Sequence, residues 1–137
     1  GTAGAGGSQS VFSATYPGGT PGAGLDCPIT GTVICYAGGA RGNGTFSYGS
    51  NPSGCGAGDG GSKRSNGGRS TAGEANKGGG GGPPELGYGI PKHGGSGVVI
   101  LKVPNGDYTG NVTGSPTVTE FEGHKIITFT GSGSYTH

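Results

Sequence analysis

The sequence predicts a mainly β and irregular fold with no helix, in which a glycine-rich, polyproline II-like scaffold with short strands precedes a small antiparallel β module. Glycine and proline account for 38 and 9 of the 137 residues, and they disfavour a helix interior by about 1 and about 3 kcal/mol each. Val, Ile, Leu and Phe supply only 20 side chains for a core. Since 32 of the 38 glycines lie before residue 105, the two ends of the chain differ in character.

The first part of the chain carries three short apolar islands. Each is rich in β-branched or aromatic residues and is bounded by Gly, Pro or Asn, which is typical of a short strand between turns. These predicted strands are SVFSATY at residues 10–16, ITGTVICY at 29–36 and TFSY at 45–48.

Residues 49–97 contain almost no side chains that pack. Such a stretch is either a flexible spacer or a bundle of polyproline II segments whose backbones hydrogen-bond to each other. The low formal charge of +1 and the interspersed strands favour the bundle, and both interpretations stay open. We therefore divide the chain into a scaffold of residues 1–96 and a β-rich module of residues 97–137.

The second part reads as a sequence of strands and turns. GVVILKV is an apolar run of the length of a buried strand, whereas TVTEF and KIITFT suit a hairpin around Glu122 and Gly123. Asn105 and Gly106 form a strong turn signal. The predicted strands cover residues 97–103, 107–112, 117–121 and 125–130, and residues 131–136 close the chain. One face of the hairpin is predicted to hold Val118, Phe121, Ile127 and Phe129.

Several functional classes are excluded by composition. No apolar run approaches the roughly 18 residues of a membrane span. Eight basic against seven acidic side chains give no electrostatic footprint for nucleic acid. No secretory signal is visible at the start, and a chain that begins with Gly and lacks Met is expected to be processed or to be a segment of a longer one.

The residue types that carry chemistry show no catalytic or metal-binding spacing. Cys27, Cys35 and Cys55 are separated by 8 and 20 residues, which fits no zinc motif. Cys27 and Cys35 flank a predicted turn at residues 28–31 and are the candidate disulfide pair. The GAGDGG run at residues 56–61 lacks the flanking strand and helix of a dinucleotide loop. We therefore expect no metal, no cofactor and no enzymatic activity.

Aromatic residues among the glycines are the candidate receptor-binding residues, because aromatic faces stack on sugar rings and anchor interfaces. They are Phe46, Tyr48 and Tyr88. The alternative is that these rings only cover the sides of a bundle. The small basic cluster of Lys63, Arg64 and Arg69 is interpreted as a solvated loop.

Four stretches together resemble the glycine-rich domain of tailed-bacteriophage virion proteins, which occurs in tail fibres, adhesins and related appendages. They are PITGTVICYAGG at residues 28–39, the glycine run at 78–82, GGSGVVILKVP at 94–104 and GSPTVTEFEGHKIITFTGSGSYTH at 114–137. The GGSGVVI-type strand and the terminal TFTGSGS segment are the more specific elements. The resemblance covers roughly residues 25–137.

The resemblance implies a structural protein of the virion surface without catalytic residues. Its expected partners are other copies of itself, as a trimer, and other virion proteins, together with a host-surface glycan or outer-membrane protein. Assembly in the cytoplasm would leave the cysteines reduced. The alternative functions are a self-assembling extracellular filament subunit and, with less support, an ice-binding protein built on a polyproline II bundle.

Overall fold

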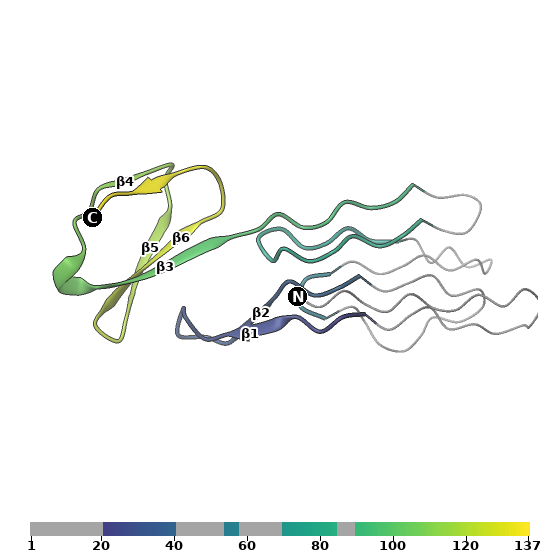
Figure 1. The fold of residues 1–137 in the computed structure, drawn as a ribbon, viewed down its shortest axis with the longest axis horizontal. Coiled ribbons are helices and arrows are strands. Elements are labelled where there is room, and N and C mark those ends of the chain that lie inside the picture. The colour runs from purple at the N-terminus through teal and green to yellow at the C-terminus, as the bar shows by residue number, and fades with distance from the viewer. Residues whose placement is uncertain (1–20, 41–53, 58–69, 85–89) are drawn as a thin grey trace, which may run out of the picture.

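A computed structural model describes residues 21–40, 54–57, 70–84 and 90–137, which form a bundle of extended segments next to a small β module (Figure 1). These residues hold antiparallel strands, one 3₁₀ turn and no α-helix, so the predicted fold class is confirmed. The elements are β1 (Leu25–Cys27), β2 (Ile34–Tyr36), β3 (Val99–Pro104), η1 (Asn105–Asp107), β4 (Val112–Thr113), β5 (Thr117–Phe121), β6 (His124–Phe129) and β7 (Ser134–Tyr135).

Backbone hydrogen bonds hold the bundle together, and those of one segment connect it to three different neighbouring segments. Residues 78–82 lie between three other segments, and their N–H groups donate to each of them: Gly78 to Ser96, Gly80 to Gly38 and Gly82 to Thr71. A strand in a sheet has only two edges. A segment bonded on three sides is therefore not a sheet strand.

The same three-way pattern recurs within three consecutive residues. The N–H groups of Ala37, Gly38 and Gly39 donate to the carbonyl oxygens of Lys77 at 2.8 Å, Cys55 at 3.3 Å and Gly22 at 3.0 Å. Polyproline II has three residues per turn and no internal hydrogen bonds, so successive N–H groups point to different neighbours. In the described residues the glycine-rich region is thus a hydrogen-bonded bundle with polyproline II-like periodicity, and the spacer interpretation does not fit them.

Glycine is required where the segments touch. A Cβ added at Gly95 would overlap the carbonyl oxygen of Glu74, and one at Gly79 would overlap the backbone of Gly56. Because the backbones themselves are in contact, there is no room for side chains between these segments. Hydrogen bonding here replaces the side-chain core that the composition lacks.

The β module is centred on β6. The sheet order is β3-β6-β5, with all neighbours antiparallel, and β4 pairs with β7 in a separate small sheet. Ile126 and Ile127 are both 0% exposed although consecutive residues face opposite sides of a sheet. Both faces of β6 are therefore covered.

Each face of this sheet has its own cover. The register places Val118 and Phe129 on the face of Ile127, and the Phe129 ring packs against Gly133, where an added Cβ would come within 2.7 Å. Phe121 lies on the opposite face, where a Cβ added at Gly31 of the β1–β2 turn would come within 2.8 Å of the Phe121 ring. The prediction that Phe121 shares a face with Val118 is wrong, because residues three apart on a strand point to opposite sides.

The predicted strands are only partly found. Strand β5 has the predicted bounds, and β3 and β6 differ from prediction by one or two residues. The strand predicted at residues 107–112 is wrong except at Val112, where β4 begins, because Asp107 belongs to η1 and residues 108–111 form no strand. The one predicted at 29–36 is a turn followed by β2, which pairs with β1. The predicted strands at residues 10–16 and 45–48 lie outside the described residues.

Candidate functional site

Most of the described segments of the bundle extend away from the β module. The Gly78–Ser96 hydrogen bond lies close to the start of β3, whereas the bonds made by Gly82 to Thr71 and Lys92 lie further along the segments. The segments that end at residues 40, 70, 84 and 90 extend away from the β module (Figure 1), and residues 41–53, 58–69 and 85–89 connect the described segments.

These three connecting ranges contain all the candidate receptor-binding residues. Phe46, Tyr48 and Tyr88 lie outside the described residues, as do Lys63, Arg64 and Arg69. Their side-chain geometry is not described, so their proposed role stays a prediction. Two of the three ranges adjoin the turn at residues 54–57, which the Cys35–Cys55 disulfide holds beside the β1–β2 hairpin.

A disulfide joins the hairpin to the bundle, and it is not the predicted pair. Cys35 is bonded to Cys55, while Cys27 is a free thiol. The register explains the difference. Cys35 lies directly opposite Asp26, whereas Cys27 lies opposite Ile34, so Cys27 and Cys35 project from opposite faces of the hairpin. The expectation of reduced cysteines also does not fit this structure.

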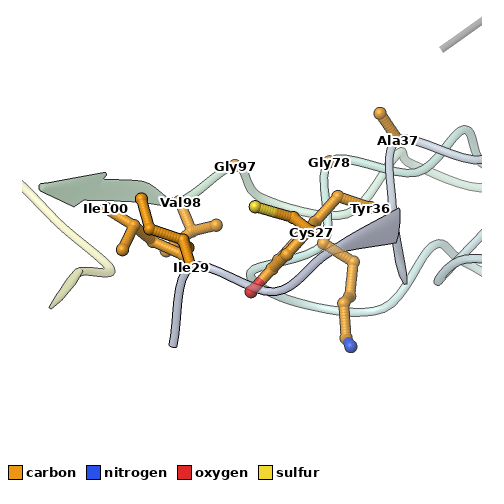
Figure 2. Close-up of a pocket in the computed structure, with 9 residues that line it drawn as sticks. Cys27, Ile29, Tyr36, Ala37, Gly78, Gly97, Val98 and Ile100 are labelled. Carbon is orange, nitrogen blue, oxygen red and sulfur yellow. The ribbon is translucent and has the colours of Figure 1, made fainter. Parts of the chain in front are cut away.

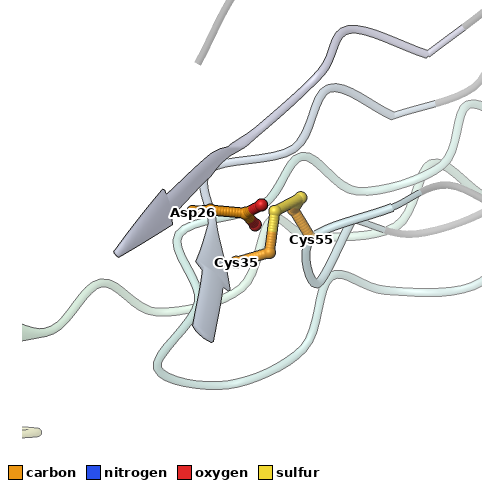
Figure 3. A group of neighbouring side chains, drawn as sticks. All are labelled: Asp26, Cys35 and Cys55. Carbon is orange, nitrogen blue, oxygen red and sulfur yellow. A yellow bond between two sulfur atoms is a disulfide. The ribbon is translucent and has the colours of Figure 1, made fainter. Parts of the chain in front are cut away.

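Asp26 completes a cluster with the two bonded cysteines (Figure 3). Its carboxylate and the sulfur atoms of Cys35 and Cys55 all lie within 4.8 Å of one another. The expectation of no metal site rested on sequence spacing alone, which does not reveal this neighbourhood. As a disulfide the two sulfurs are not thiolate ligands.

An open apolar groove of about 320 Å³ lies at the junction between the bundle and the β module. Figure 2 shows Ile29 of the β1–β2 turn next to Val98, which precedes β3, and Ile100 of β3, with Cys27 and Tyr36 further along. The ammonium group of Lys77 lies 5.4 Å from the centre of the Tyr36 ring at this junction. Because most of its lining residues are apolar, the groove suits an apolar group better than a polar substrate.

The polar groups of the β module brace its turns. The Nζ of Lys125 donates to Glu120 at 2.6 Å and the Nδ2 of Asn105 donates to the same carboxylate at 2.9 Å. The hydrogen bond from Lys125, then that from Asn105, lowers the pKa of Glu120 from its ordinary value of 4.5. The Nδ1–H of His124 donates to the carbonyl oxygen of Glu122 at 2.7 Å. These contacts serve the β5–β6 hairpin.

Comparisons with protein-family models, curated proteins and solved structures give no match to this chain. None of the described residues belongs to a helix with the length and apolar character that a membrane span requires.

Proposed function

We propose that this chain is a non-enzymatic structural appendage protein of a bacteriophage virion, of the tail-fibre, adhesin or capsid-fibre type, whose bundle presents its connecting segments to the host surface. The observation that carries the proposal is the arrangement of the bundle. The described segments that end at residues 40, 70, 84 and 90 extend away from the β module, whereas the turn at residues 54–57 lies beside the β1–β2 hairpin (Figure 1).

The bundle suits this role because backbone contacts order its described segments without a side-chain core. The segments are fixed by hydrogen bonds between their backbones and by close glycine contacts. Binding residues are commonly carried on loops that a rigid scaffold positions.

Phe46, Tyr48 and Tyr88 are the residues that we propose contact a host glycan or outer-membrane protein. Aromatic rings offer a stacking surface for sugars and anchor protein interfaces. Single contacts of this kind are weak. Several copies on one particle, for example a trimer, raise the effective concentration of the remaining sites once the first has bound.

A cell-binding assay tests the contact residues. The labelled full chain is titrated onto a panel of bacterial cells and onto their isolated surface glycans. We expect the triple variant Phe46→Ala, Tyr48→Ala, Tyr88→Ala to bind at least about ten-fold more weakly. The matched control is Val33→Ala, which removes a 63% exposed apolar side chain near the opposite end. Equal binding by the triple variant and the control would contradict the assignment.

The filament subunit is the second candidate because the described residues expose apolar side chains. Val33, Ile90 and Val99 are 63%, 78% and 58% exposed, and sheet edges with exposed apolar residues favour association between chains. Cryo-electron microscopy of the native assembly separates the two functions. Density at the tail or capsid periphery supports the virion protein, and a helical polymer of this chain alone supports the filament.

A further inference from the structure

Three separate parts of the chain bring two sulfur atoms and a carboxylate to one place (Figure 3). Asp26 on β1 lies directly opposite Cys35 on β2. Cys55 comes from the turn at residues 54–57, which the N–H of Gly38 links to the hairpin. The three potential ligand atoms lie within 4.8 Å of one another.

The backbone around Cys55 fixes the position of its side chain. Cys55 has φ of 61° and Gly56 has φ of 76°, and a non-glycine residue in this left-handed region costs about 1–2 kcal/mol. Gly24 closes on the same residue, since a Cβ added there would lie 2.6 Å from the Cys55 Sγ. The place of this sulfur is therefore set by the local backbone as well as by the bond to Cys35.

The carboxylate of Asp26 has no charge partner among the described residues. The ion pairs found there join Lys102 to Glu122 and Lys125 to Glu120. Asp26 is exposed on the hairpin, and its carboxylate points toward the two sulfurs (Figure 3). A cation at this place would meet a carboxylate that no described basic side chain neutralises.

We propose that the dithiol form of this cluster binds one zinc ion through Cys35 Sγ, Cys55 Sγ and the Asp26 carboxylate. Zinc takes thiolate and carboxylate ligands in tetrahedral sites at about 2.3 and 2.0–2.2 Å, which leaves a fourth position for water. The inference does not rest on the proposed function.

Metal binding and the disulfide exclude each other. A dithiol reductant transfers two electrons and two protons to the Cys35–Cys55 bond, which becomes two thiols while the reductant becomes a disulfide. Zinc then displaces the two thiol protons, which pass to solvent. In the disulfide form no thiolate is present and the site is closed to the metal.

A cobalt titration of the full chain tests the proposal, because thiolate-bound Co²⁺ has a sulfur-to-metal charge-transfer band. The reduced protein is titrated anaerobically with Co²⁺ and then with Zn²⁺. We expect saturation at one equivalent, displacement by zinc and no binding by the oxidised protein. Asp26→Asn should weaken binding at least about ten-fold, because loss of even an outer-shell partner of a metal ligand has an effect of that size, and Cys55→Ser should remove the band. Cys27→Ser is the matched control and should bind as wild type does.

Other outcomes overturn the proposal. They are the absence of saturable binding, loss of the band in Cys27→Ser, and an Asp26→Asn variant with unchanged affinity. Circular dichroism of the reduced chain checks the fold in parallel. A reduced chain that loses its β signal and does not recover it with zinc also contradicts a preformed site.

Discussion

Glycine in the bundle acts as the point at which one backbone touches another. Gly73, Gly79 and Gly95 each lie where an added Cβ would overlap the backbone of a neighbouring segment. In an ordinary core, neighbouring side chains fill the space beside a small residue. Here an added methyl group separates two hydrogen-bonded chains, so its cost comes from steric overlap.

Gly95→Ala tests this at a single residue. The new Cβ would overlap the carbonyl oxygen of Glu74, and we expect the free energy of unfolding to fall by about 1–3 kcal/mol. Gly97→Ala is the control, since nothing lies within 4 Å of the corresponding position. Urea unfolding followed by circular dichroism compares them. Equal stability of the two variants would contradict backbone contact at Gly95.

Glu120 makes the stability of the β module sensitive to acid. Hydrogen bonds from Lys125 and Asn105 lower the pKa of Glu120 below its ordinary value of 4.5. A lowered folded pKa adds stability that is present above the unfolded pKa and is lost as the pH falls through the folded pKa. We expect the stability difference between wild type and Glu120→Gln to be constant near neutral pH and to shrink below about pH 4.5. Urea unfolding at a series of pH values measures this stability difference. A difference that grew as the pH fell would contradict the stabilising role of ionised Glu120.

Among the elements, β6 explains why the strands of the β module could be predicted from the sequence. Its Ile126 and Ile127 are buried on opposite faces, and β5 beside it is rich in β-branched and aromatic residues. Strong apolar patterns and the turn at Glu122 and Gly123 together made this hairpin predictable.

The β1–β2 hairpin was less predictable because its strands have three residues each. A strand of that length shows no clear alternation, and Leu-Asp-Cys carries little β preference. The predicted strand at residues 29–36 also contains Gly31, whose φ of 87° belongs to a turn. The turn at residues 28–31 was predicted, but the register that pairs Cys35 with Asp26 and places Cys27 on the opposite face was not.

The turn of the β5–β6 hairpin offers a stabilising change. Glu122 has φ of 48° and is followed by Gly123 with φ of 72°, the geometry in which hairpin turns favour Asn-Gly. We expect Glu122→Asn to raise the free energy of unfolding by about 0.5–1 kcal/mol. Glu122→Gln is the control, because it removes the same 3.8 Å exposed ion pair with Lys102 without easing the backbone. Thermal unfolding compares the two, and an equal gain in both would assign the effect to charge.

For the molecule as a whole, the Cys35–Cys55 bond joins the hairpin to the bundle across a sequence separation of 20 residues. A closed loop of this length stabilises a fold by about 2–4 kcal/mol. We expect Cys55→Ser to lower the free energy of unfolding by that amount in oxidised, metal-free protein, and Cys27→Ser to leave it nearly unchanged. A larger loss in Cys27→Ser would indicate the Cys27–Cys35 pairing instead.

The arrangement of the bundle was the least predictable part. A run such as residues 78–82 has the same chemical character at every position, so it carries no register, and nothing in it indicates which segments become its neighbours. The same limit applies to Asp26 and Cys55, which meet only through the bundle and the hairpin. The roles of Phe46, Tyr48 and Tyr88 depend on segments outside the described residues and stay predictions.

Amide hydrogen exchange of the full chain, followed by nuclear magnetic resonance, tests the central claim most directly. The account predicts that the N–H groups of Ala37, Gly38, Gly80 and Gly95, which donate to other segments, exchange at least about a hundred-fold more slowly than those of unstructured glycine peptides. Exchange at the unstructured rate in these residues, with protection confined to the β module, would show that the glycine-rich region is a spacer and would contradict the account.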